Sequence, residues 1–133
     1  LKPEWSGHAA VPECRDRIRI ELLGRIAEVL PAPESIGQMR AADQHHVWND
    51  TYLRMRYEYR PDLPLYLILI RAYRLREPQW IPQRASYAGC KSWVNLTEEI
   101  DVSGAAEVLD DAAFAGMGAG LAGDLRAALP LQS

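Results

Sequence analysis

The chain has 133 residues, of which 48% are hydrophobic and 25% charged, and its formal net charge is -3. This length fits one domain, residues 1–133, that can bury a core without metal ions or disulfides. The composition excludes a disordered or fibrous protein. The longest apolar run, Leu63 to Ile70, is interrupted by Pro64 and is far shorter than the ~20 residues that a membrane helix needs, so we expect no membrane partner.

The start of the chain and its cysteines bear on location. The first residue is Leu1 rather than methionine, so we expect that an upstream N-terminal segment is missing, and the residues that follow lack the pattern of a secretory signal. Cys14 and Cys90 have no CxxC or Cys/His spacing, which permits a disulfide but does not require one. We therefore expect a cytoplasmic protein without a metal ion or other cofactor.

Residues 17–30 fit the apolar spacing of both a strand and a helix. Gly24 is costly inside a helix but suits a bulge, so we predict a long bulged strand. Pro31 ends this strand, and residues 34–42 then predict a short helix.

Residues 49–59 have a helical pattern, with Asn49 or Asp50 as the cap. Four large side chains that fall on one face of this helix are predicted to lie in the core: Trp48, Tyr52, Met55 and Tyr59.

Residues 65–75 give the clearest strand, because Leu65 to Ile70 offer no polar side chain on either face. We predict a central strand that is buried on both faces. Its last part, from Arg71 to Arg76, is expected to emerge into water, and a loop containing Pro78 and Pro82 should follow.

The rest of the chain predicts a strand over residues 92–96 and a helix capped by Asp110 or Asp111. Glycines within this helix predict that it is frayed or held only by docking of its apolar side chains, which are Phe114, Leu121 and Leu125. Together the elements predict an α+β fold, with a small mixed or antiparallel sheet flanked by helices.

Three blocks of residues carry a family resemblance: His46-Val47-Trp48, the run from Arg56 to Leu75, and Tyr87-Ala88-Gly89-Cys90-Lys91-Ser92-Trp93-Val94. In this order they resemble a bacterial family known as domain of unknown function DUF1802, over roughly residues 1–127. The family implies no activity. The order of elements also resembles the small barrel-like modules of the PUA and ASCH type, many of which bind RNA or modified nucleobases.

Candidate enzymatic groups are present but do not form a motif. His45 and His46 lack the HExxH spacing of a zinc site, and structural or capping roles are the commoner ones for such histidines. Cys90 has no base in a sequence motif beside it and is interpreted as an inert, buried thiol. These histidines, or a second set of side chains that are all acidic, give a metal-dependent hydrolase or nuclease-like enzyme as one alternative. The acidic set is Glu98, Glu99, Asp101, Asp110 and Asp111.

Charge is unevenly distributed along the chain. Residues 51–91 hold eight basic and three acidic side chains, whereas residues 92–133 hold one and seven. The two segments either neutralise each other or leave the basic one for an anionic partner. Within the basic segment arginines alternate with aromatic residues, as a surface that contacts phosphates and stacks bases requires.

We therefore predict a non-enzymatic binding module with RNA or DNA as its partner, and a protein-interaction subunit as a further alternative. The predicted ligand-binding residues are Arg71, Tyr73, Arg74, Arg84, Tyr87, Gly89, Lys91 and Trp93. Gly89 would allow a left-handed backbone, and Trp93 is either a core residue or a stacking platform. The four cations of this set are expected to converge on one face.

Overall fold

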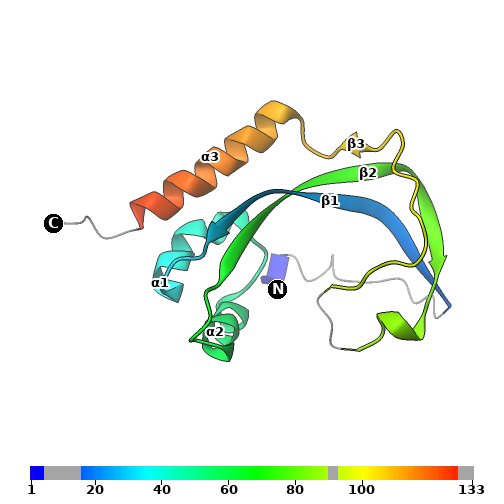
Figure 1. The fold of residues 1–133 in the computed structure, drawn as a ribbon. Helices are drawn as coiled ribbons and strands as arrows, with labels where there is room; N and C mark the ends of the chain where they lie inside the picture. The colour runs from blue at the N-terminus through cyan, green and yellow to red at the C-terminus, as the bar shows by residue number, and fades with distance from the viewer. Residues whose placement is uncertain (5–15, 90–92, 129–133) are drawn as a thin grey trace. The chain divides into compact units, whose positions relative to one another are not determined.

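The computed structural model describes residues 1–4, 16–89 and 93–128 (Figure 1). Its elements in chain order are β1 (Arg17–Pro31), α1 (Ile36–Met39), the 3-10 helix η2 (Arg40–His45), α2 (Asp50–Tyr59), β2 (Tyr66–Pro82), the 3-10 helix η3 (Ala85–Tyr87), β3 (Ala106–Glu107) and α3 (Asp111–Ala127). The fold is α+β, as predicted. None of the described helices is long and apolar enough to cross a membrane.

The described strands form one open sheet in the order β1-β2-β3. β2 and β3 pair antiparallel, with Tyr73 opposite Glu107. β1 and β2 also run antiparallel, because the end of β1 is bonded to the start of β2 and the start of β1 to the end of β2. The Ala32 N–H donates to the Leu65 carbonyl, and the Gln83 N–H donates to the Asp16 carbonyl. The sheet is thus the antiparallel form of the two that the sequence allowed, and its described strands do not close into a PUA-like barrel.

The chain divides into two compact units. The helical unit comprises Leu1–Ala10, Ile26–Ile70 and Leu109–Ser133, and the strand unit comprises Val11–Arg25 and Arg71–Val108. Both long strands contribute residues to each unit. That the chain is one domain stays a prediction.

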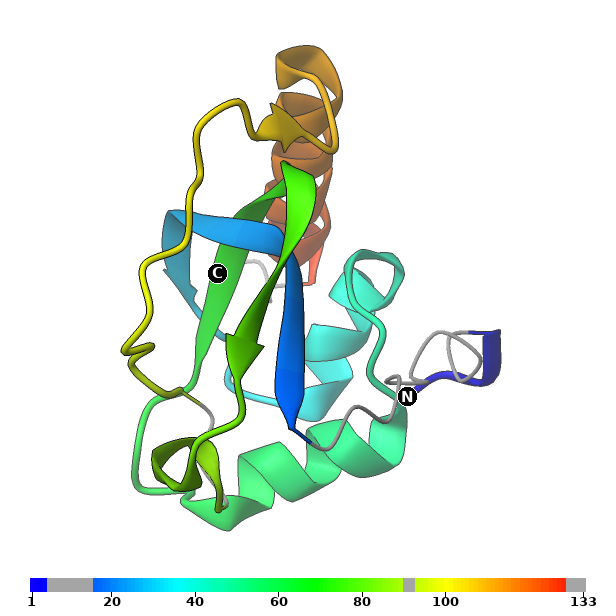
Figure 2. The ribbon, with the colours of Figure 1, turned by 90° about the vertical axis from the view of Figure 1, so that its right-hand side faces the viewer.

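The core of the helical unit is formed by four buried side chains, Met39, Ala42, Leu53 and Leu121, with Ile36, Tyr57, Leu67 and Leu125 packed against them. Within this unit η2 packs against α3, and α1 packs against both η2 and α2 (Figure 2). The short helix predicted over residues 34–42 is therefore α1 continued as η2. It begins at a capping box, in which Ser35 and Gln38 satisfy each other's backbone N–H groups.

The predicted burial of β2 on both faces is wrong. Leu67 and Leu69 are partly covered, whereas Tyr66, Ile68 and Ile70 on the opposite face are exposed. Among the described residues of this unit, the buried core lies on the Leu67 side, so the apolar composition of both faces of β2 does not produce two covered faces. The central position of β2 between β1 and β3 is confirmed.

The aromatic stripe predicted for α2 is also wrong. The helix itself and its Asn49 cap are confirmed, but Trp48, Met55 and Tyr59 are exposed. The buried face carries Leu53 and the partly buried Tyr57 instead. The position of α1 and the turn before α2 decide which face of α2 is buried. The size of the side chains therefore did not identify the buried face.

Two boundaries differ from the sequence prediction. β2 continues through Pro78 to Pro82, where a loop was expected, and residues 93–96 form no strand; the third strand is β3 instead. Among the described residues, β3 pairs with β2 at Tyr73 and Arg74 and not at Pro78, and a proline is tolerated where a strand lacks a hydrogen-bonded neighbour.

The cap of α3 is confirmed, since Asp110 Oδ1 accepts from the Ala113 N–H at 2.7 Å. The helix is held by docking, with Leu121 buried and Leu125 packed on the core. Two of its glycines allow close packing: a Cβ at Gly118 would lie 3.4 Å from Leu69 Cδ2, and one at Gly120 would lie 3.4 Å from His45 Cε1.

Candidate functional site

The pleat of β2 separates the predicted site residues of the strand unit. Successive side chains of a strand point to opposite faces, and the burial of Leu75 and Ile81 marks the covered face. Arg71 and Tyr73 share that face and are half-buried. Arg74 lies on the other face, which is exposed, so the structure does not bring Arg71 and Arg74 onto one surface.

Arg71 is engaged within the strand unit. Its guanidinium carbon lies 5.8 Å from the centroid of the Tyr73 ring, and its Nη2 lies 3.7 Å from Glu107 Oε1. A carboxylate from the acidic C-terminal segment therefore offsets part of the charge of Arg71. For Arg71, this contact favours the alternative in which the acidic segment neutralises the basic one.

Arg84 and Tyr87 converge on the same carboxylate. Arg84 Nε donates to Glu98 Oε1 at 2.6 Å, and the Tyr87 hydroxyl donates to Glu98 Oε2 at 2.6 Å. Thr97 adds two contacts, from its hydroxyl to Glu98 and from its N–H to the Tyr87 hydroxyl, both at 2.9 Å. The hydrogen bond from Arg84, followed by that from Tyr87, lowers the pKa of Glu98 to about 2, and Glu98 raises the pKa of Arg84.

The segment between Tyr87 and Thr97 carries the remaining predicted residues. Gly89 has φ +101°, so the prediction of a left-handed backbone there is confirmed. The core interpretation of Trp93 is wrong, since its relative exposure is 74%. Cys90 and Lys91 lie outside the described residues, as does Cys14.

The exposed face of β2 in the strand unit holds a group that the sequence did not select as a set. Arg74, Arg76 and Trp80 lie two and four positions apart, so they share one face of the strand, and all three are exposed. In the part of the chain that the structure describes, neither arginine has an acidic side chain within salt-bridge distance. We call this set the Arg/Trp face. The sequence signal that could have identified this face is the apolar Leu75 between the two arginines, which is the alternation expected of a strand with one covered face.

The histidines considered as metal ligands have other partners in the helical unit. His45 Nε2 lies 2.9 Å from Asp124 Oδ2, and His46 Nδ1 accepts from the Trp48 N–H at 3.2 Å. Hydrogen bonds from His45 and Gln44 lower the pKa of Asp124. Across residues 1–4, 16–89 and 93–128, no group of three or more His, Cys, Asp or Glu side chains is placed to hold a metal ion.

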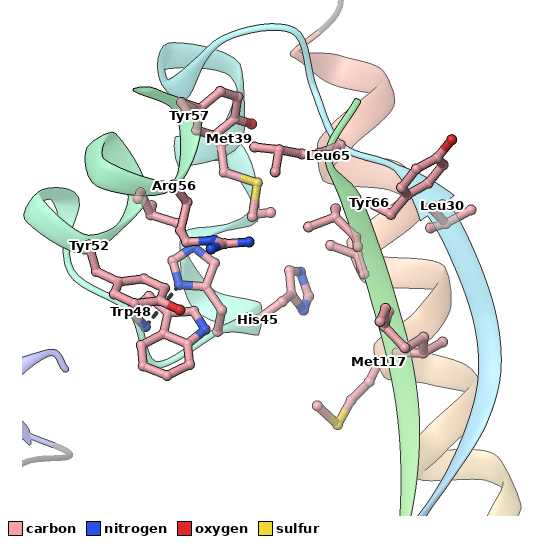
Figure 3. A pocket seen from close by; sticks show the side chains of 18 residues that line it. Leu30, Met39, His45, Trp48, Tyr52, Arg56, Tyr57, Leu65, Tyr66 and Met117 are labelled. Carbon is pink, nitrogen blue, oxygen red and sulfur yellow. Dashed lines mark hydrogen bonds between the residues drawn. The ribbon is translucent and has the colours of Figure 1, made fainter. Parts of the chain in front are cut away.

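A pocket of about 340 Å³ lies in the helical unit, and all its lining residues belong to that unit (Figure 3). Side chains from β2, α1, α2 and α3 form its apolar walls, and His45, His46 and Arg56 are among its polar groups. This pocket was not predicted from the sequence, because it is formed by segments far apart in the chain.

The structure thus defines a small α+β protein with an open antiparallel sheet and a helical core. The family described as domain of unknown function DUF1802 matches residues 1–119, and the chain belongs to this family. No curated protein and no solved structure matched the chain.

Proposed function

We propose that the strand unit binds single-stranded nucleic acid, RNA in particular, through the Arg/Trp face. One observation carries the proposal: Trp80 is exposed on the same strand face as Arg74 and Arg76, which have no acidic partner among the described residues. Proteins that bind single strands combine cationic side chains for the phosphates with aromatic platforms for the bases. This face supplies both.

The spacing along β2 suits an extended strand of nucleic acid. Arg76 precedes Trp80 by four positions, which corresponds to about 13 Å along a strand. A base stacked on the indole would therefore leave a neighbouring phosphate within reach of a long arginine side chain. Trp93, exposed on the segment that Glu98 ties to Arg84, provides a second aromatic surface in the same unit.

The roles of the other predicted residues follow from their contacts. Arg84 and Tyr87 form hydrogen bonds with Glu98 and act on binding by holding the segment that carries Trp93. Arg71 is paired with Glu107, which offsets part of its charge, so it contributes less than Arg74 to phosphate binding. The same proposal places the protein in the cytoplasm of a bacterium, where RNA is available to it.

Fluorescence anisotropy with labelled oligouridylate and oligothymidylate at about 50 and about 200 mM salt tests the proposal. Arg74→Ala should weaken binding and reduce the salt slope by about one, as for the loss of one phosphate contact. Trp80→Ala should cost about 1–3 kcal/mol of binding free energy with little change in that slope, because stacking is not ionic.

Arg54→Ala is the matched control, since Arg54 is an exposed arginine of α2 in the helical unit. It should bind as the natural protein does. The proposal is wrong if neither oligonucleotide binds, or if Arg54→Ala weakens binding as much as Arg74→Ala does.

A further inference from the structure

We propose that the pocket of the helical unit binds a small carboxylic acid with an apolar body, whose carboxylate is held by His46 and Arg56. This is a second site with a different ligand from that of the Arg/Trp face. It rests only on residues of the helical unit and does not depend on the proposed nucleic-acid binding.

The walls of the pocket are suited to an apolar body. They are formed mainly by aliphatic and thioether side chains, including Leu30, Met39, Leu53, Leu67, Leu69 and Met117. Trp48 and Tyr52, which also line the pocket, stack on each other with ring centroids 4.3 Å apart. A volume of about 340 Å³ lies at the small end of the range for ligand pockets, about 300–1,000 Å³. Mostly apolar walls with few polar groups are typical of small-molecule sites.

His46 supplies a hydrogen-bond donor that has no acceptor in the protein. Its Nδ1 accepts from the Trp48 N–H at 3.2 Å, so a neutral ring carries its proton on Nε2. Burial, followed by the charge of Lys2, lowers the pKa of His46 and favours this neutral form.

The Nε2 atom is buried without a hydrogen-bond partner. The nearest carboxylate oxygen, Oδ1 of Asp43, lies 3.9 Å away, beyond hydrogen-bonding distance, and is paired with Lys2. A buried donor of this kind is unusual and destabilising, and an acceptor on a ligand would satisfy it.

Arg56 supplies the charge. Its side chain extends from α2 toward the pocket, and among the described residues no acidic side chain lies within salt-bridge distance of it (Figure 3). The other basic group nearby, His45, is bonded to Asp124. A guanidinium and one N–H together match the two oxygens of a carboxylate. The apolar surface of the walls favours an organic body.

Isothermal titration calorimetry and amide chemical-shift mapping with phenylbutyrate, phenylbutanol and acetate test the inference. Phenylbutyrate should bind at one site and shift the resonances of pocket residues. Phenylbutanol should bind at least about tenfold more weakly, because it lacks the charge that the arginine recognises. Acetate should not bind measurably, because it has almost no apolar body.

Arg56→Gln should weaken phenylbutyrate binding by about tenfold or more and remove the preference for the acid over the alcohol. The matched control is Arg54→Gln, two residues away on α2, exposed and not part of the pocket lining. Both arginines are exposed, so both variants should fold.

A nitrogen-15 spectrum of the His46 ring should show the Nε2–H tautomer in the free protein and a shift of Nε2 on adding phenylbutyrate. The inference is overturned if the acid and the alcohol bind equally, if Arg54→Gln and Arg56→Gln have the same effect, or if no probe shifts the pocket.

Discussion

Arg84 and Glu98, fourteen positions apart, are joined by a hydrogen bond of 2.6 Å from Nε to Oε1. The other oxygen of the same carboxylate accepts from the Tyr87 hydroxyl. One acidic side chain that follows Trp93 in the chain is therefore bonded to two residues that precede it, which ties the two ends of this segment together. The contact also shows where part of the basic charge goes, since Glu98 lies in the acidic C-terminal segment and Arg84 in the basic one.

This carboxylate predicts a specific response to acid. Glu98 has a pKa of about 2 in the folded protein, against a usual 4.5. Because the folded pKa is the lower one, the stabilisation is fully present above pH 4.5 and is lost as the pH falls toward 2. Glu98→Gln should lower the melting temperature at neutral pH, and its difference from the natural protein should shrink as the pH falls from about 5 to about 2.5. A difference that is constant over this range would contradict the assignment.

Much of the fold could be predicted from the sequence, because the signals involved are local. Pro31 after an apolar run, Asn49 before a helical pattern and Asp110 before another mark ends that depend on nearby backbone groups. What failed was the assignment of covered faces. Ile68 and Met55 are as apolar as buried residues, and only the position of distant segments decides that they are exposed.

The candidate sites show the same limit. Trp80 and Trp93 are exposed, whereas Tyr73 and Tyr87 are partly buried. Interpreting the alternation of charged and aromatic residues after Ile70 as one surface ignored the pleat, which separates Arg71 from Arg74. The pocket that contains His46 and Arg56 is lined by residues of β1, β2, α1, η2, α2 and α3. No spacing in the sequence predicts such a set.

Two methionines test the corrected core of the helical unit. Met39 is 5% exposed in the core cluster, whereas Met55 on α2 is 57% exposed. Met39→Ala should lower the free energy of unfolding by about 2–5 kcal/mol, through lost burial and the cavity that remains. Met55→Ala should change it by less than about 0.5 kcal/mol. Urea denaturation of both variants measures the difference, and equal effects would show that the core has been misplaced.

Two glycines should respond in opposite directions to alanine. Gly123 lies within α3, and a Cβ there would meet nothing within 4 Å. Gly123→Ala should therefore stabilise the protein by about 0.5–1 kcal/mol through helix propensity. Gly89 also has open space around it but has φ +101°, so Gly89→Ala should destabilise by about 1–2 kcal/mol from backbone strain. Thermal melts of the two variants should move apart; a shift in the same direction would refute this account.

Two tyrosines of α2 distinguish the observed buried face from the one that the aromatic pattern suggested. The Tyr57 hydroxyl donates to the Pro33 carbonyl at 2.9 Å in a partly buried position, whereas Tyr59 is exposed. Tyr57→Phe should lower the free energy of unfolding by about 0.5–1.5 kcal/mol, because the carbonyl loses its donor. Tyr59→Phe should have almost no effect, since an exposed hydroxyl bonds to water in the folded and the unfolded protein alike.

The same pair differs in alkaline solution. Burial raises the pKa of Tyr57 above its usual 10.0. Because the folded state holds this proton more tightly than the unfolded state does, the stabilisation is complete below pH 10.0 and is lost as the pH rises through the higher, folded pKa. The natural protein and Tyr59→Phe should therefore lose stability above pH 10.0 more steeply than Tyr57→Phe. Denaturation curves at rising pH measure this, and parallel losses in all three proteins would show that the Tyr57 hydroxyl is not buried against Pro33.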